Sequence, residues 1–288
     1  MRLPFLVLAP ACVLLGLGTA LWSQGQVNYF YFVLALIGAV CAHISVNAFN
    51  EYFDFKSGLD TRTDRTPFSG GSGTLPAHPQ LEKQAFMICV ISFAITVAIG
   101  IFFLYVYGYP LLPLGLLGLF IIVVYTPFMT HNPFLCLIAP GLGFGPLMVM
   151  GTDFVLTGSY SLSAFIASLV PFFLVNDLLL LNQFPDVKAD KSIGRRHFPV
   201  LIGKRKSSII YGLFLVLTYL AIVIGTWFDY LPPYSLLGLI TLVIAIPLSI
   251  GTFKNAENEV GKLMPFLGMN VIVNLATPVL VSVGLFVG

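Results

Sequence analysis

Charged side chains are scarce in this sequence, and that scarcity already excludes most classes of protein. Only 9% of the 288 residues are Asp, Glu, Lys or Arg, whereas 58% are hydrophobic. Soluble domains carry about 25% charged residues, so the composition excludes an ordinary soluble protein. The formal net charge of +2 is too small to predict nucleic acid as a partner. We therefore expect an integral membrane protein.

Cysteine is also scarce, and its four positions lack the spacing of metal ligands. All four fall inside hydrophobic runs, at Cys12, Cys41, Cys89 and Cys136. Such positions are typical of buried free thiols. Neither a disulfide framework nor a cysteine metal site is predicted.

Long polar segments are missing except at two places, about residues 54–82 and 185–206. Long ordered loops in compact proteins are usually functional. Nothing in the sequence marks a second domain, so residues 1–288 are expected to form a single membrane domain.

Long hydrophobic runs are what the sequence has in abundance. Nine of them qualify as spanning helices, which need about 20 mostly apolar residues. Closed barrels also satisfy backbone groups in lipid, but these runs are too long and too continuously apolar for alternating barrel strands. The predicted fold class is therefore all-α, a polytopic bundle of about nine transmembrane helices around a central cavity. The runs cover residues 4–22, 29–53, 83–107, 110–128, 134–152, 161–184, 207–228, 233–252 and 263–287.

The few basic residues lie on one side of the predicted membrane. They precede the first run, at Arg2, or follow the second, sixth and eighth runs. Because loops rich in Lys and Arg stay in the cytoplasm, both long loops are predicted to be cytoplasmic, with the chain in a cell inner membrane. The opposite side has short connections whose charges are Asp153 and Asp229.

Two acidic motifs stand where hydrophobic runs give way to these loops. They are Asn50–Asp54, continuing to Asp60, and Asn182–Asp186, continuing to Asp190. Each places an Asn and an Asp four positions apart, on one face of a helix. Carboxylates beside a bilayer are costly unless they bind something. Two such clusters facing each other would form a cage for Mg²⁺ and a diphosphate.

A polar stripe leads along the second predicted helix to the first motif. His43, Asn47, Asn50 and Asp54 recur at intervals of four, three and four, so they share one helical face that borders the bundle interior or a wet cavity. Interhelical hydrogen bonding is an alternative explanation for the stripe. The second motif, which Asn182 opens, repeats the pattern on the sixth helix and favours a ligand site.

Basic residues near both motifs would complete a site for a metal and a diphosphate. Mg²⁺ is usually held by one or two carboxylates plus phosphate oxygens of the substrate, and cations cover the remaining negative charge. Each basic residue could instead only hold its loop at the membrane face. The predicted diphosphate-binding residues are Lys56, Arg62, Arg65, Lys188 and Lys191, and Arg195, Arg196 and Arg2 are further candidates. The glycine-rich stretch 68–74 is no P-loop, but its backbone N–H groups could serve a mobile lid over the diphosphate.

These motifs resemble the UbiA superfamily of intramembrane prenyltransferases over nearly the whole chain. The segment Asn50–Asp60 (N-E-x-x-D-x-K-x-G-x-D) is similar to the first motif of the menaquinone-type branch, the 1,4-dihydroxy-2-naphthoate polyprenyltransferases. Asn182–Gly203 (N-x-x-x-D-x-x-x-D-x-x-x-G, then P-V-L-I-G) is similar to the second motif. The chain departs from that branch at Glu51, where Asp is usual, and at Phe144, where Glu often follows Gly-Leu-Gly.

The resemblance implies a Mg²⁺-dependent transferase that acts by electrophilic prenylation within membrane lipid. The implied donor is an allylic polyprenyl diphosphate. The implied acceptor is an aromatic quinone precursor, 1,4-dihydroxy-2-naphthoate ahead of 4-hydroxybenzoate, with a glycerol-phosphate lipid as an alternative. By residue, it implies metal binding by Asn50, Asp54, Asp186 and Asp190 and catalytic roles for the three aspartates. It also implies that Asn47 lines the cavity. His43 and Asn182 are predicted to line it as well, because they lie on the same helical faces as the motif residues. The roles of Glu51, Asp60 and Asp177 stay open.

Three rival classes share some of these features. A transporter would have similar mid-membrane polar residues and proline interruptions, such as Pro140, Pro146 and Pro171, but its binding residues would lie near the midplane rather than at one face. An assembly protein without chemistry leaves the paired carboxylates unexplained. A phosphatidyl-transferring enzyme would also use Mg²⁺ and Asp, but its D-G-x-x-A-R segment is absent from the sequence.

Overall fold

The computed structural model describes residues 3–63 and 65–288, so Arg2 lies outside the described residues. Over that part of the chain it contains helices and turns and no β-strand, which confirms the all-α prediction. The longer helices are α1 (Leu8–Gln24), α2 (Tyr29–Lys56), α4 (Glu82–Tyr107), α5 (Leu112–Val124), α6 (Pro133–Leu142), α7 (Gly151–Thr157), α8 (Leu162–Asn182), α11 (Lys204–Trp227), α12 (Leu242–Asn255) and α13 (Val260–Val287). Three short helices lie in the loops, namely α3 (Thr74–Ala77), α9 (Val187–Ser192) and α10 (Phe198–Leu201).

Eight helical stretches among the described residues are long and apolar enough to cross a membrane. They correspond to eight of the nine predicted runs and confirm an integral membrane protein. The remaining run, residues 110–128, forms the shorter apolar helix Tyr109–Val124, which falls below the about 20 residues of a typical span.

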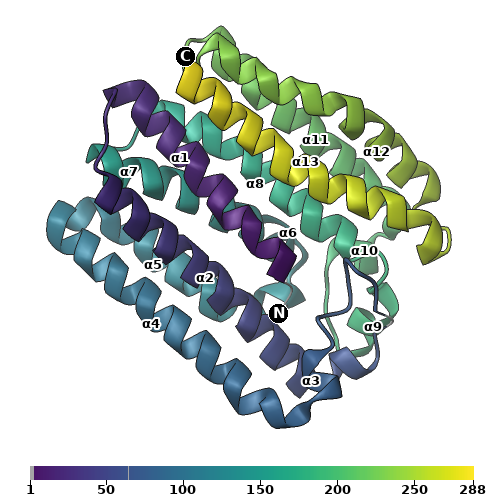
Figure 1. The fold of residues 1–288 in the computed structure, drawn as a ribbon. Coiled ribbons are helices and arrows are strands. Elements are labelled where there is room, and N and C mark those ends of the chain that lie inside the picture. The colour runs from purple at the N-terminus through teal and green to yellow at the C-terminus, as the bar shows by residue number, and fades with distance from the viewer. Residues whose placement is uncertain (1–2, 64) are drawn as a thin grey trace.

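The long helices lie side by side in one bundle (Figure 1). Helix α1 runs between α2 and α13 and packs against both. Helices α2, α4 and α5 lie on one side of α1, and α11, α12 and α13 lie on the other. The short helices α3, α9 and α10 gather at one end of the bundle. We call this the motif end, because both acidic motifs lead into these short helices.

Helix α2 carries the polar stripe as one unbroken helix. The Asn28 side chain caps its start by accepting hydrogen bonds from the backbone N–H groups of Phe30 and Tyr31, at 3.0 and 3.3 Å. Its end is fixed by Gly58, whose φ of 74° lies in the left-handed region that favours glycine. The first motif therefore occupies the last turns of α2, as predicted.

The second motif is not on one helix, and the prediction of a continuous helical pattern from Asn182 to Asp190 is wrong. Helix α8 ends at Asn182, a turn follows, and Asp186 precedes the short helix α9 that contains Asp190. Pro185 explains the break, because proline has no backbone N–H to continue the helix and disfavours the α conformation of the residue before it.

The predicted run at residues 134–152 is interrupted by a π-helical segment, Gly143–Met150, between α6 and α7. Pro146 lies inside it and cannot donate a backbone hydrogen bond, which accounts for the wider turn. Close packing holds the segment against α8, since a Cβ on Gly145 would lie 2.5 Å from the Ser168 carbonyl oxygen.

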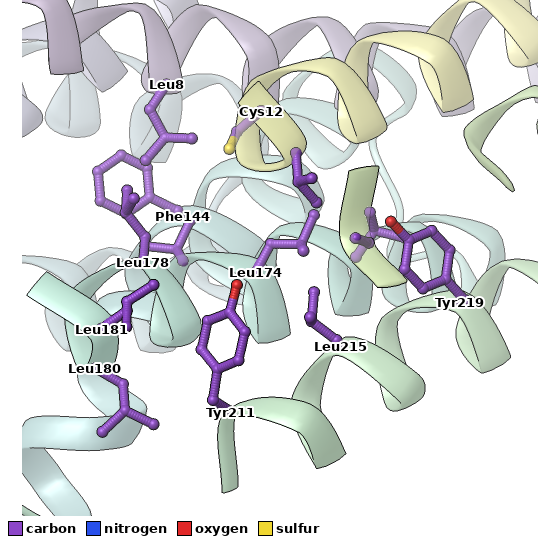
Figure 2. Close-up of a cluster of buried hydrophobic side chains, with 14 of the residues drawn as sticks. Leu8, Cys12, Phe144, Leu174, Leu178, Leu180, Leu181, Tyr211, Leu215 and Tyr219 are labelled. Atoms are coloured by element: carbon purple, nitrogen blue, oxygen red, sulfur yellow. The ribbon is translucent and has the colours of Figure 1, made fainter. Parts of the chain in front are cut away.

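The largest buried core joins α1, α8, α11 and α13. Figure 2 shows Leu174 of α8 between Cys12 of α1 and Leu215 of α11. The Tyr211 hydroxyl donates to Asn270 Oδ1 at 3.0 Å, which ties α11 to α13. The site described next lies between this core and the α2, α4 and α5 side of the bundle.

Candidate active site

A cavity of about 480 Å³ leads from the motif end into the bundle. Its volume falls in the range of about 300–1,000 Å³ that is typical of small-molecule sites. Polar residues of both motifs line the motif end, whereas the interior is lined by apolar side chains such as Phe103, Leu114 and Leu147 and by Gly115 and Gly118 of α5. The cavity therefore joins a charged mouth to an apolar interior.

Every predicted metal or cavity residue lines this cavity, namely His43, Asn47, Asn50, Asp54, Asn182, Asp186 and Asp190. Local bonds orient some of them. The Asn47 amide donates to the His43 carbonyl oxygen at 3.0 Å, and the Asn50 amide donates to Thr126 Oγ1 at 3.4 Å. The structure thus brings the stripe of α2 and the second motif to the same space.

One arginine connects the two motifs. Arg195 Nη1 donates to Asp190 Oδ1 at 3.0 Å, and Arg195 Nη2 forms an ion pair with Asp54 Oδ1. The Arg195 side chain is only 13% exposed. Burial opposes the charge on its guanidinium, but the carboxylates of Asp54 and Asp190 outweigh this effect and raise the pKa of Arg195.

His197 completes the surroundings of Asp190. Its Nε2 lies 2.9 Å from Asp190 Oδ2, so both oxygens of this carboxylate have partners. Both His197 and Asp190 are buried. Asp190 is therefore held through both of its carboxylate oxygens.

The glycine-rich stretch folds over the mouth of the cavity. The Gly70 backbone N–H donates to Asp186 Oδ2 at 3.0 Å, and the Ser72 hydroxyl donates to Glu51. Gly70, Gly71 and Gly73 have φ values of 79°, 69° and 77°, which residues with a Cβ rarely adopt. This stretch, which we call the lid (residues 68–74), contacts both motifs, as the prediction of a covering loop requires.

Asp60 lies beneath the lid. A Cβ on Gly71 would be 2.6 Å from Asp60 Oδ1, so only glycine fits there without a shift. Burial and the nearby Glu51 raise the pKa of Asp60 to about 6, against the opposing effects of Arg65 and Arg195. Asp60 therefore belongs to the site in space, although the sequence left its role open.

The predicted diphosphate-binding cations lie outside the cavity lining as the described residues form it. Lys56 pairs with Glu82 at 2.6 Å, and its side chain is 50% exposed. Arg62 Nη1 donates to Ser192 Oγ at 3.4 Å, which joins the two loops at the surface. The other three predicted cations, Arg65, Lys188 and Lys191, are also exposed. Their contact with diphosphate stays a prediction that this arrangement does not support.

Asp177 is buried in α8 beyond the cavity, on the side of α11 and α13. Its backbone carbonyl oxygen accepts a bond from the Asn270 amide at 3.5 Å. Neither carboxyl oxygen of Asp177 has a hydrogen-bond partner within the described structure. Asp177 is not among the residues described as lining the cavity, which argues against contact with a substrate there.

The donor set at the mouth fits Mg²⁺ bound together with a phosphate-containing ligand. Asp60 Oδ2 and Asn182 Oδ1 are buried oxygens without a hydrogen-bond partner in the part of the chain that the structure describes. That part has no three His, Cys, Asp or Glu side chains grouped closely enough to hold a metal by themselves. Mg²⁺ does not need such a group, because it usually keeps waters and phosphate oxygens as ligands beside one or two carboxylates.

Sequence reasoning ranked Arg195 below other cations and missed His197, Gly70 and Ser72 as individual site residues. Arg195 follows Gly194, whose φ of 82° turns the chain so that the next side chain can point back to the motifs. The three-residue spacing from Gly194 to His197 carried no recognisable signal. Only the fold of the loop brings Arg195 to Asp54 and Asp190, and His197 to Asp190.

Comparison with known proteins identifies what this arrangement is similar to. The family model described as the UbiA prenyltransferase family matches residues 9–270. The chain is 27% identical over 214 residues to a 1,4-dihydroxy-2-naphthoate octaprenyltransferase of Bacillus subtilis, covering 73% of this chain and 67% of that protein. It is 25% identical over 300 residues to the enzyme of the same name from Haemophilus influenzae, covering 98% and 93%. A digeranylgeranylglyceryl phosphate synthase of Pyrococcus horikoshii is 28% identical over 191 residues, covering 65% and 63%.

Solved structures share the fold. A UbiA homolog from Aeropyrum pernix, in its apo form, superposes with a TM-score of 0.76 at 17% identity, covering 100% of this chain and 98% of that one. A UbiA homolog from Archaeoglobus fulgidus, bound to DMAPP and Mg²⁺, gives a TM-score of 0.63 at 16% identity, covering 98% of each chain. At these identities the likeness concerns the fold.

Proposed function

Because the chain belongs to the UbiA prenyltransferase family and is a membrane prenyltransferase, we propose that it prenylates an aromatic quinone precursor. In this proposal the donor is an allylic polyprenyl diphosphate, the preferred acceptor is 1,4-dihydroxy-2-naphthoate, and Mg²⁺ is the cofactor. Membership of this enzyme family favours an enzyme over the transporter and the assembly protein that the sequence left as alternatives.

The observation that carries the proposal is the meeting of two acidic motifs at the mouth of an apolar cavity. Asp54 of the first motif and Asp190 of the second are close enough for one guanidinium to bind both. A charged mouth above an apolar interior matches a substrate with a diphosphate head and a hydrocarbon tail. The apolar lining supports binding of the tail away from water.

Asn50, Asp54, Asp186 and Asp190 would hold Mg²⁺ in this site. When bound there, Mg²⁺ would neutralise the charge that develops on the diphosphate as it leaves. A homolog of the same fold was solved with DMAPP and Mg²⁺, which supports the same cofactor here. The Gly70 N–H donates to Asp186 from the lid, so it would lie beside a head group bound at the mouth.

The reaction breaks one bond and forms another at C1 of the donor. The allylic C1–O bond breaks, and its electron pair leaves with the diphosphate. A ring carbon of the acceptor attacks C1, and the ring then loses a proton or CO₂ to restore its aromaticity. The cavity walls hold the allylic cation in a place from which water is excluded, so that the acceptor rather than water captures it.

The names of the relatives support the choice of acceptor. Two of them act on 1,4-dihydroxy-2-naphthoate, and one of these aligns over nearly the full length of both chains. The digeranylgeranylglyceryl phosphate synthase aligns over a smaller part and favours a glycerol-phosphate acceptor as the second candidate. We further infer from the basic loops that the motif end faces the cytoplasm.

A test of this function uses the purified full chain in detergent. The protein is given geranylgeranyl diphosphate with 1,4-dihydroxy-2-naphthoate, 4-hydroxybenzoate or a geranylgeranylglyceryl phosphate, with and without Mg²⁺. We expect diphosphate release and a prenylated naphthoate, identified by mass, only when Mg²⁺ is present. Transfer to the glycerol phosphate alone would replace the proposed acceptor, and release from none of the pairs would contradict the proposed activity.

A further inference from the structure

Arg195 lies where a metal-bound head group would meet both acidic motifs. Its two guanidinium nitrogens bind Asp190 Oδ1, at 3.0 Å, and Asp54 Oδ1. The Asp54 and Asp190 side chains are 11% and 4% exposed, so the contact is largely shielded from water. One side chain from the second loop thus joins helix α2 to helix α9.

A buried cluster of carboxylates needs a cation. Asp54, Asp60 and Asp190 are all buried at the mouth of the cavity, and like charges in such a place repel one another. A planar guanidinium can bind two carboxylates at once, which an ammonium group does less well. Arg195 is therefore the counter-ion that keeps these residues together in the ligand-free protein.

The oxygens bound by Arg195 belong to residues that we propose as metal ligands. We infer that Arg195 is a displaceable cation: it bridges Asp54 and Asp190 in the ligand-free protein and moves to the diphosphate when metal and substrate bind. This inference rests on the proposed function for the identity of its ligand. It assigns Arg195 a positioning role in the free protein and a binding role in the complex.

The exchange couples the binding of metal to the binding of diphosphate. A metal that arrives alone must displace the guanidinium and leaves it without a partner, which weakens binding. A diphosphate arriving with the metal offers the guanidinium a bidentate partner, which restores the lost hydrogen bonds. By linkage each ligand then strengthens the other by the same factor, typically about 5–150-fold.

Arg196 offers a matched control for Arg195. It is the next residue and carries the same charge, but it is exposed and lies outside the cavity lining that the described residues form, so the structure does not support the diphosphate contact for which it was a candidate. Its backbone N–H donates to the Thr130 carbonyl oxygen at 3.1 Å, an interaction that a change of side chain preserves. Replacing either arginine changes the net charge of the loop equally, so only the bridge differs between the two variants.

The experiment measures Mn²⁺ binding by electron paramagnetic resonance, because Mn²⁺ accepts the same oxygen ligands as Mg²⁺. The purified full chain, Arg195→Gln, Arg195→Lys and Arg196→Gln are titrated with Mn²⁺ in the absence of diphosphate. Binding of radiolabelled geranylgeranyl diphosphate is then measured for each protein at saturating Mn²⁺. Thermal unfolding is followed at each step to verify the fold.

We expect Arg195→Gln to bind Mn²⁺ alone about 5-fold or more tightly than the unmodified chain, and to bind the prenyl diphosphate at least about 10-fold more weakly. Arg195→Lys, which keeps a charge but cannot span both carboxylates, should lie between them. Arg196→Gln should match the unmodified chain in both measurements. Added Mn²⁺ should restore the thermal stability that Arg195→Gln loses.

Other results overturn the inference in distinguishable ways. Unchanged or weaker Mn²⁺ binding by a folded Arg195→Gln or Arg195→Lys would show that Arg195 only clamps the second loop to helix α2. If neither variant folds even with Mn²⁺ present, the clamp is again its role. No Mn²⁺ binding by the unmodified chain, with or without diphosphate, would contradict the proposed metal site itself.

Discussion

Helices α2 and α8 lead to the two acidic motifs, yet they are buried to very different extents. Their most apolar windows have nearly the same mean hydropathy, 2.0 and 2.1, but 22% of the α2 window is buried inside the protein, against 67% of the α8 window. Helix α8 packs against α6, α11 and α13, whereas the main partner of α2 is α4. One motif thus follows a central helix, and the other ends a helix that is mostly only partly covered and that lines the cavity along one face.

This difference shows what hydropathy measures in a membrane protein. Lipid tails are as apolar as leucine, so an apolar residue gains little by moving from lipid into the protein interior. Mean hydropathy therefore predicts that a helix spans the membrane without predicting what covers it. The polar stripe of α2 is more informative, because its members must avoid lipid wherever they lie.

The largest effect is expected from removing one carboxylate from each side of the mouth. Asp54→Asn and Asp186→Asn keep the size of the side chain but lose its charge, and we expect each to lower turnover by at least about 100-fold, as loss of a group that stabilises developing charge does. Diphosphate release measures this loss. Equal losses would mean that α2 and the turn after α8 contribute equally, and normal turnover in either folded variant would contradict the metal cage.

A second comparison tests how tightly the protein is packed on the α8 side and on the α4 side. A Cβ on Gly145, which contacts α8, would lie 2.5 Å from the Ser168 carbonyl oxygen, whereas a Cβ on Gly100 of α4 meets nothing within 4 Å. Gly145→Ala should destabilise the protein by about 1–3 kcal/mol through overpacking. Gly100→Ala should stabilise it by up to about 1 kcal/mol, because alanine favours helix. The measurement is the free energy of unfolding in detergent, and similar values for both variants would refute the asymmetry.

A third prediction concerns the more loosely packed side of the cavity. Gly115 of α5 lines the cavity, and a Cβ there meets nothing within 4 Å. Gly115→Phe should fill the space meant for a long prenyl tail and raise the KM for geranylgeranyl diphosphate about 10-fold, roughly the worth of one or two methylenes in an apolar pocket. Geranyl diphosphate should be affected less, and Gly115→Ala serves as the control. An equal effect on both donors would show that the tail lies elsewhere.

The sequence predicted the features that the bilayer imposes and missed those that depend on tertiary packing. The helical runs were predictable because every backbone group in lipid must be bonded internally. The early end of α8 could have been predicted from Pro185, which disfavours helix at the preceding residue. Pro146 marks a local break in the helix, but the close approach of Gly145 to α8 was not predictable, since tertiary packing sets it.

The candidate site divides in the same way. The stripe from His43 to Asp54 was found because its spacing matches the period of a helix. The same reasoning pointed to Asp186 and Asp190, although they lie beyond the end of α8. Which of the cations reaches the carboxylates was not predicted, because a charge in a loop is placed by the turn before it. Gly194 and the buried His197 bring Arg195 to Asp190, while the equally charged Lys191 stays at the surface.

The smallest expected effect concerns Glu51, where this chain departs from the usual Asp. The Glu51 carboxylate accepts a hydrogen bond from Ser72, so it fastens the lid to the α2 side of the mouth. Glu51→Asp keeps the charge but shortens the arm by a methylene, and a single hydrogen bond contributes about 0.5–1.5 kcal/mol. We expect a rise of about 2–10-fold in the KM for the prenyl diphosphate with little change in kcat. Ser72→Ala should reproduce this effect, and the two changes together should add nothing further, because they remove the same bond. Complete inactivity of Glu51→Asp would instead mean that the longer arm takes part in binding the head group, and that the α2 side of the mouth contributes more to the site than a single lid contact.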